Sequence, residues 1–143
     1  MSRLLYKDID KSILKALPNP TDQAYEVKIK IPEFTFLGVY DQPDFAKVYL
    51  LMYPGKKIVE LKSLKLYIQS LRNIVVSYER LINIFYDHLM ETYEPARMRV
   101  TVICNPRGGI SSKLVIDSDW KERGGDEKYI AYQEKEDEWS VLL

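Results

Sequence analysis

The hydrophobic period of the chain changes within Val59-Glu60-Leu61-Lys62-Ser63-Leu64-Lys65-Leu66-Tyr67. Up to Leu61 the pattern is that of a strand, whereas from Ser63 the apolar residues recur at helical spacing. The run therefore predicts the place where a strand gives way to a helix. Lys62 and Lys65 are three residues apart, so they share one side of that helix.

Working outward from this run, the alternation of apolar and polar residues predicts strands over 24–31 and 45–53, with a loop over 34–43 between them. Pro54-Gly55 is a turn signal, after which 57–61 is expected to return antiparallel. A second helix is predicted over 77–92 with Ser77 as its N-cap, and Pro95 stops it. Strands follow at 98–104 and 113–116. This order predicts an α+β fold, an antiparallel sheet with two helices on one face.

The length of 143 residues fits one domain with a core of its own. Residues 1–23 are expected to form an irregular lead-in, because Pro18-Asn19-Pro20 interrupts regular structure. Residues 24–117 form the predicted domain. Residues 118–143 are polar and acidic and are expected to be a tail.

Composition excludes several classes of protein. Lys and Arg number 21, as do Asp and Glu, so the net charge gives no reason to expect strong nucleic-acid binding. A single cysteine, Cys104, excludes an internal disulfide and suits a reducing, cytoplasmic location. With one histidine besides, no metal site is predicted. No run approaches the roughly 20 apolar residues of a membrane span.

Several polar residues have both a structural and a functional interpretation. Asp44 follows Pro43, so it either caps a backbone group or donates a proton in a pocket. Glu79 lies near a helix start, where it either offsets the helix dipole or accepts two hydrogen bonds from a guanine-type ring. Lys62 and Lys65 either form a solvated face or contact phosphate, as does Arg107 beside Gly108-Gly109.

Three motifs occur in a fixed order: Gln42-Pro43-Asp44-Phe45, then Glu60-Leu61-Lys62-Ser63-Leu64-Lys65, then Asn105-Pro106-Arg107-Gly108-Gly109. From about residue 24 to 116 the chain resembles the NADPH-dependent 7-cyano-7-deazaguanine reductases, the nitrile reductases of queuosine synthesis (QueF type). This resemblance implies the tunnelling fold, in which subunits join their sheets edge to edge into a barrel. It also implies a homo-oligomer with active sites between neighbouring subunits.

The resemblance assigns roles to particular residues. Asp44 matches the family's acid. Substrate contacts are implied for Val59, Glu60 and Leu61 and for Tyr78-Glu79, where the family has a His-Glu pair that holds the deazaguanine ring. Contacts to NADPH are implied for Lys62, Ser63 and Lys65, and for Arg107 with Gly108. Tyr78 departs from the family pattern, because a tyrosine cannot become a cation at neutral pH.

A second departure concerns the family's nucleophile. Phe34-Thr35-Phe36-Leu37-Gly38 matches the family's Phe-Thr-x-Leu-Cys except at its last residue, and Gly38 reaches Asp44 in six residues where the family takes seven. In the family this cysteine attacks the nitrile carbon and forms a thioimide.

Three functions follow from that departure. The first is a nitrile reductase with a changed mechanism, for which Cys104 is a hypothetical replacement thiol. The second is a module that binds a deazaguanine or a nucleotide without reducing it. The third is an amidinotransferase that acts on the nitrile in tRNA. It ranks last, because that branch keeps the cysteine and lacks the NADPH motif, whereas this chain shows the reverse pattern.

Overall fold

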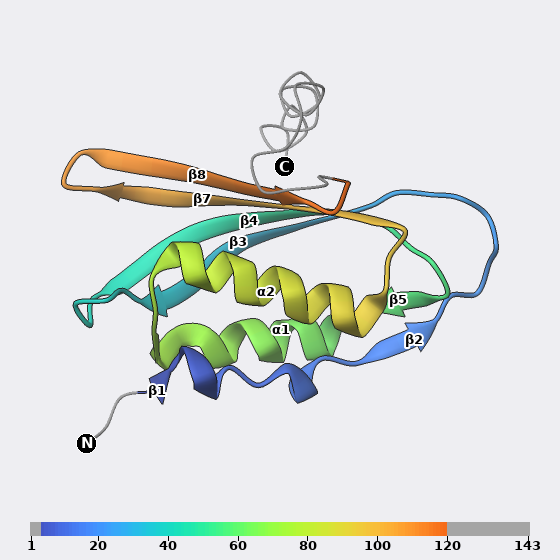
Figure 1. The fold of residues 1–143 in the computed structure, drawn as a ribbon, viewed down its shortest axis with the longest axis horizontal. Helices are drawn as coiled ribbons and strands as arrows, with labels where there is room; N and C mark the ends of the chain where they lie inside the picture. Colours follow the sequence, from blue (N-terminus) through green and yellow to red (C-terminus); the bar gives the residue numbers. More distant parts are fainter. Residues whose placement is uncertain (1–3, 120–143) are drawn as a thin grey trace.

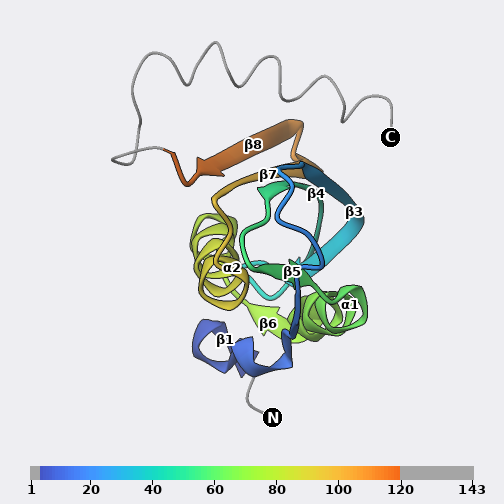
Figure 2. The same cartoon turned by 90° about the vertical axis from the view of Figure 1, so that its right-hand side faces the viewer.

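A curved β-sheet carries both α-helices on one of its faces (Figures 1 and 2). The computed structural model of the chain describes residues 4–119, so nearly all of the expected tail lies outside the described residues. The α-helices are α1 (Leu61–Ser70) and α2 (Tyr78–Tyr93), and the 3-10 helices are η1 (Tyr6–Asp8), η2 (Lys11–Ile13) and η3 (Leu71–Asn73). The strands are β1 (Leu4–Leu5), β2 (Ala16–Pro18), β3 (Val27–Leu37), β4 (Pro43–Tyr53), β5 (Lys57–Val59), β6 (Ile74–Val75), β7 (Arg97–Arg107) and β8 (Ile110–Asp117).

The main sheet has the strand order β1-β6-β3-β4-β7-β8. Its four long strands, β3, β4, β7 and β8, pair antiparallel, whereas the two-residue strands β1 and β6 add parallel pairs at one side. The predicted α+β architecture, an antiparallel sheet with two helices on one face, is confirmed.

The core lies between the helices and the face of the sheet that they cover. Successive side chains of a strand point to opposite faces, so Val48, Leu50 and Met52 of β4 face the helices together. Phe85 of α2 and Tyr67 of α1 meet them in one buried cluster. The same alternation directs the residues between them to the opposite, helix-free face.

Both helices begin at side-chain caps. The Ser77 hydroxyl accepts a hydrogen bond from the Arg80 backbone N–H at 3.3 Å, which confirms the predicted N-cap of α2. The Glu60 carboxylate caps α1, accepting from the N–H groups of Lys62 (2.8 Å) and Ser63 (3.0 Å). Helix α2 ends at Tyr93, and its C-cap Glu94, immediately before Pro95, has a φ of 47° in the left-handed region.

The predicted loop over 34–43 is wrong in its first half. Strand β3 continues to Leu37, and the loop before β4 is only residues 38–42. Pro32 lies within this strand, where the register shifts between Ile31 and Phe34, so the proline lies at a bulge. Phe34 and Phe36 beyond it are buried in the core.

Two further expectations are corrected. Strand β5 pairs with β2 and not with β4, because both edges of β4 are occupied by β3 and β7. The lead-in is also more regular than predicted. It contains β1, η1, η2 and β2, and Ile9 and Leu14 are buried in the core. Pro18 ends β2 in a two-stranded sheet, where its missing N–H is tolerated.

A buried ion cluster joins the last two strands. Asp117 of β8 accepts hydrogen bonds from Arg97 Nε (3.1 Å) and Nη2 (2.6 Å) and from Arg99 Nη1 (3.0 Å). Burial by itself raises the pKa of Asp117, but the hydrogen bonds from Arg97, Asp119 and Arg99 outweigh it and lower the pKa.

Neither described helix combines the length and apolar character that crossing a bilayer requires.

We expect Asp117→Ala to lower the free energy of unfolding by about 3–5 kcal/mol, because it removes the buried carboxylate that Arg97 and Arg99 share. Urea unfolding measures this change, and Glu91→Ala, which removes an exposed pair with Lys11, should have little effect. Because the pKa of Asp117 is lower in the folded state, Asp117 contributes its full share to the free energy of unfolding at pH values above its unfolded pKa of about 3.9. That contribution is lost as the pH falls through the folded-state pKa. Equal unfolding midpoints for Asp117→Ala and the wild type would contradict the assignment.

Candidate active site

A pocket of about 270 Å³ lies where the β3–β4 and β7–β8 hairpins meet the start of α2. We call it the hairpin pocket. It combines polar and apolar residues from five elements, β3, β4, α2, β7 and β8. Its lining consists of Phe36, Asp44, Phe45, Tyr78, Cys104, Asn105, Arg107, Ile110 and Ser112.

Sheet register brings these residues together. Phe36 pairs with Asp44 across β3 and β4, and Cys104 pairs with both Ala46 of β4 and Ser112 of β8. Asp44 and Ala46 are two residues apart on one strand, so they share a face. Asp44, Cys104 and Ser112 therefore lie on the helix side of the sheet, near its hairpin end.

Asp44 and Arg107 form an ion pair in this pocket, from Arg107 Nη1 to Asp44 Oδ1. Asp44 comes from the start of β4 and Arg107 from the end of β7, so the pair joins the two hairpins. The turn after Arg107 consists of Gly108 and Gly109, with φ values of 60° and 82° that favour glycine. The first and third of the three motifs therefore meet in the folded chain.

Gly38 lies directly against this ion pair. A Cβ atom at position 38 would be 2.5 Å from Asp44 Oδ2 and 3.6 Å from Arg107 Nη1. The loop is closed by two hydrogen bonds of 2.7 Å, from Gly38 N–H to Gln42 O and from Asp41 N–H to Gly38 O. The Asp44 carboxylate therefore takes up space that a larger side chain at position 38 would need.

Tyr78 and Glu79 lie at the first turn of α2, beside the hairpin pocket. The Tyr78 hydroxyl is 3.2 Å from Ser112 Oγ, which fastens the helix start to β8. Glu79 is exposed and does not line the pocket, yet its charge contributes to the pKa of Cys104 within it. Asp44, Tyr78, Glu79 and Arg107 thus gather at one end of the molecule.

Cys104 lines the same pocket as Asp44, as the replacement-thiol hypothesis requires. Burial raises the pKa of its thiol to about 11, and the negative charges of Asp44 and Glu79 act in the same direction. The thiol is therefore protonated at neutral pH. Only the thiolate is a strong nucleophile, so this surrounding opposes the activation that a catalytic cysteine needs.

The remaining predicted site residues lie at the other end of the chain's long axis. Val59 ends β5, Glu60 caps α1, and Leu61 and Lys62 begin that helix. Figure 1 places β5 and the start of α1 opposite the two hairpin tips. Strand β4 separates the two groups, and about ten residues at roughly 3.3 Å each give a separation on the order of 30 Å. One chain does not bring the two groups together.

Two of these residues already have structural partners. The Glu60 carboxylate is engaged by the α1 backbone, as described above. Ser63 is buried, and its hydroxyl donates to Glu60 O at 2.8 Å and accepts from Lys15 N–H at 3.0 Å. Ser63 therefore holds the lead-in against α1.

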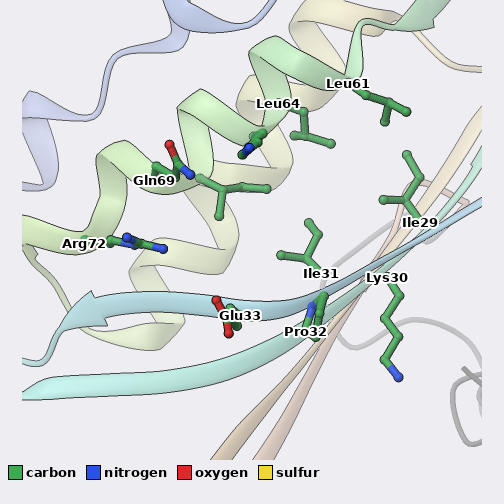
Figure 3. A pocket seen from close by; sticks show the side chains of 11 residues that line it. Ile29, Lys30, Ile31, Pro32, Glu33, Leu61, Leu64, Gln69 and Arg72 are labelled. Atoms are coloured by element: carbon green, nitrogen blue, oxygen red, sulfur yellow. The ribbon is translucent and has the colours of Figure 1, made fainter.

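Lys65 faces a groove of about 320 Å³ between α1 and β3, which we call the helix groove. Its floor is apolar, with Ile29 and Ile31 of β3 opposite Leu61 and Leu64 of α1 (Figure 3). Arg72 and Gln69 lie at the end of the groove nearest the C-terminus of α1. Lys62 is exposed at the start of the same helix.

Sequence reasoning missed five lining residues of the hairpin pocket: Phe36, Phe45, Asn105, Ile110 and Ser112. Ile110 and Ser112 lie before the predicted start of the last strand. A usable signal was the two-residue alternation of Ser112, Leu114 and Ile116, which continues the strand toward the Gly108-Gly109 turn.

Comparison with known proteins adds to this geometry. A family model described as "QueF-like protein" matches residues 43–122. The chain is 39% identical to the NADPH-dependent 7-cyano-7-deazaguanine reductase of Prochlorococcus marinus (strain MIT 9301), over 80% of this chain and 85% of that one. It is also 39% identical to the protein of the same name from a Nitratiruptor species, over 79% of this chain and 87% of that one.

Among solved structures, the chain resembles the archaeosine synthase QueF-Like in the apo form. The TM-score is 0.58 with 16% identity, and the match covers 68% of this chain and 95% of the other. At this identity the likeness shows a shared fold and nothing about the reaction.

The raised pKa of Cys104 predicts slow alkylation. Near pH 7.5 we expect iodoacetamide to modify the thiol roughly two orders of magnitude more slowly than free cysteine, because so little is thiolate. Mass spectrometry follows the reaction cleanly, since the chain has one cysteine. Asp44→Asn should speed the reaction by removing a nearby negative charge, whereas Asp87→Asn on the exposed side of α2 should not. Wild-type alkylation as fast as that of free cysteine would show that the thiol is activated.

Proposed function

The chain belongs to the QueF-like protein family, and on that premise we propose that it reduces the nitrile of 7-cyano-7-deazaguanine to an aminomethyl group with NADPH. This reaction serves queuosine synthesis, a tRNA modification. The single observation that carries the proposal is the hairpin pocket, where Asp44 and Arg107 meet beside Tyr78. A single thiol in the whole chain supports a reducing, cytoplasmic setting.

Reduction of a nitrile to an amine adds two hydrides to its carbon and two protons to its nitrogen. Asp44 is the proposed source of the protons, since it lines a pocket yet keeps contact with solvent from which it can be reprotonated. Its carboxylate faces Arg107. Binding of the substrate therefore has to open this pair, so that the acid faces the nitrile nitrogen.

Recognition of the purine-like ring is assigned to the start of α2. A carboxylate at Glu79 can accept two parallel hydrogen bonds from the ring N–H and the exocyclic amine. Tyr78 provides the adjoining wall, and its bond to Ser112 holds the helix start in place. Because Tyr78 replaces the family's histidine, this wall offers a neutral hydroxyl and an aromatic ring.

The helix groove fits the chemistry of an anionic dinucleotide. Lys65 and Arg72 line it above an apolar floor, and Lys62 lies exposed at its side of α1. Cations would hold the phosphates and the floor would take the rings. NADPH, when bound, supplies the hydrides for both reduction steps. Ser63 is proposed to act indirectly, by fixing the start of α1.

Assembly is the proposed means of joining the two ends of the molecule. Val59–Leu61 lie on the order of 30 Å from Asp44 along one chain, so a second copy must present them to the hairpin pocket. The tunnelling fold supports this arrangement, since its open sheet edges can pair between subunits. We therefore propose a homo-oligomer with active sites between neighbours.

Gly38 favours a second candidate, a module that binds the deazaguanine without reducing it. No thiolate can form at position 38, and Cys104 is held protonated. Without a thioimide, hydride must add to the nitrile itself, which accepts it less readily.

The proposed reductase oxidises NADPH when it is mixed with 7-cyano-7-deazaguanine, and absorbance together with product mass measures this. We expect Asp44→Asn to lower the rate by roughly 10²–10⁴-fold, the usual share of a general acid. Asp87→Asn is the matched control on an exposed part of α2. Binding of the substrate without oxidation of NADPH would favour the binding module, and absence of both would refute each candidate.

Gly38→Cys should restore the family's nucleophile. A Cβ at this position requires the Asp44 carboxylate to turn away, which a flexible side-chain end can do. We expect the variant to gain the mass of one substrate molecule per chain and to oxidise NADPH faster than the wild type. Gly38→Ser imposes the same steric demand without sulfur, so any gain shared by both variants would argue against a thioimide.

A further inference from the structure

The hairpin pocket pairs an acid with a cation, but its described lining offers no activated nucleophile. Position 38 has no side chain, and the Asp44 carboxylate lies in the space that one would fill, since a Cβ there would be 2.5 Å from Asp44 Oδ2. The thiol of Cys104 is held protonated, because burial and the charges of Asp44 and Glu79 raise its pKa to about 11. Neither position therefore supplies a thiolate.

The hydroxyl groups of the pocket are no better suited to attack a substrate carbon. The hydroxyls of Tyr78 and Ser112 lie 3.2 Å apart and bond to each other, and a hydroxyl needs an adjacent base to become a nucleophile. His88, the one histidine of the chain, is instead hydrogen-bonded to Tyr67 at 2.8 Å and is not among the lining residues. The described pocket therefore disfavours reactions that begin with a covalent bond between protein and substrate.

The ion pair in the pocket shows which kind of group the Asp44 carboxylate accepts. Asp44 Oδ1 binds Nη1 of Arg107, an N–H donor of a planar group that carries a delocalised positive charge. A protonated imine has the same features, since it is planar and cationic and its nitrogen bears two N–H donors. A nitrile is linear and neutral and has no donor. The carboxylate therefore matches a protonated imine more closely than a nitrile.

We propose that the hairpin pocket acts preferentially on a 7-deazaguanine that carries an imine in place of the nitrile. This inference rests on the ring recognition and the NADPH of the proposed function. Asp44 gives its proton to the imine nitrogen, and the imine carbon then accepts one hydride from NADPH, which is oxidised to NADP+. The π electrons of the C=N bond become the lone pair of the product amine. Asp44 regains a proton from solvent, with which it keeps contact.

Binding without NADPH provides the first test. The probe is 7-amidino-7-deazaguanine, a planar, cationic and unreactive mimic of the protonated imine. In calorimetry of the full-length protein we expect it to bind roughly tenfold or more tightly than 7-cyano-7-deazaguanine, because a charge-assisted hydrogen bond is stronger than a neutral one. Asp44→Asn should abolish this preference, whereas Asp87→Asn on the exposed side of α2 should retain it.

Two outcomes of the binding test separate this inference from the proposed function. Equal affinities of the wild type for both ligands, or a preference that persists in Asp44→Asn, would overturn the imine preference and leave ring recognition intact. Failure of both ligands to bind would refute ring recognition, and with it the proposed function as well.

Turnover provides the second test. 7-Formyl-7-deazaguanine with excess ammonium forms the imine in solution, and product mass distinguishes its reduction from reduction of the aldehyde. We expect kcat/KM with NADPH to exceed that of the nitrile by on the order of 10²-fold, because an acid contributes fully only when the substrate nitrogen is basic enough to take its proton. Turnover of the imine alone would support the inference and exclude the nitrile as substrate. An equal or higher value for the nitrile would overturn the inference and leave the proposed reductase in place.

Variants at position 38 test the cause of the preference. Gly38→Cys adds a thiol that assists only the nitrile, so the ratio of kcat/KM for imine over nitrile should fall several-fold. Gly38→Ser makes the same steric demand on Asp44 without sulfur and should keep the ratio of the wild type. Because each ratio is measured within one protein, a partly folded variant does not distort it. An equal fall in both variants would contradict the inference.

Discussion

The structure depends on burial of one face of β4 between its two antiparallel neighbours and the two helices. Val48, Leu50 and Met52 are almost completely removed from water, and β3 and β7 satisfy the backbone on either side. At roughly 25 cal/mol per Å² of apolar surface, this layer is the main source of stability. It also determines where the hairpin tips lie, and therefore where Asp44 and Arg107 meet. The site is a consequence of the register of the core strands.

The same geometry explains why some motif residues are structural within one chain. Glu60 and Ser63 are used at the start of α1, where unpaired backbone N–H groups demand acceptors. By contrast, Asp44 and Arg107 form an ion pair because the β3–β4 and β7–β8 hairpins have their turns at the same end of the sheet. Spacing along the sequence does not distinguish a residue that caps a helix from one that pairs in a pocket, because it gives no information on which polar groups become hydrogen-bond partners in the fold.

Much of the fold could be predicted from the sequence, because it follows from local pattern. The alternation in 45–53, the helical period after Ser63 and the Ser77 cap are all short-range signals, and the helices and central strands formed as expected. The predicted strand over 24–31 is too short, because β3 continues past Pro32 through a bulge that accommodates a proline. The pairing of β5 with β2 and the burial of Ile9 are long-range outcomes that no local pattern encodes. In the site, residues with a chemical motif were found, but Ser112 and Phe36 enter the pocket only through strand register.

One edge of the sheet has a consequence for assembly. On the side away from β4, the described part of β3 pairs with the sheet only at Leu37, opposite Val75. Pro32 lacks a donor there, and the bulge before Phe34 offsets the remaining backbone groups. A regular strand from an unrelated chain would find its hydrogen bonds out of phase with such an edge. Strand addition is thereby restricted to partners with a compensating offset, which protects the protein against indiscriminate aggregation.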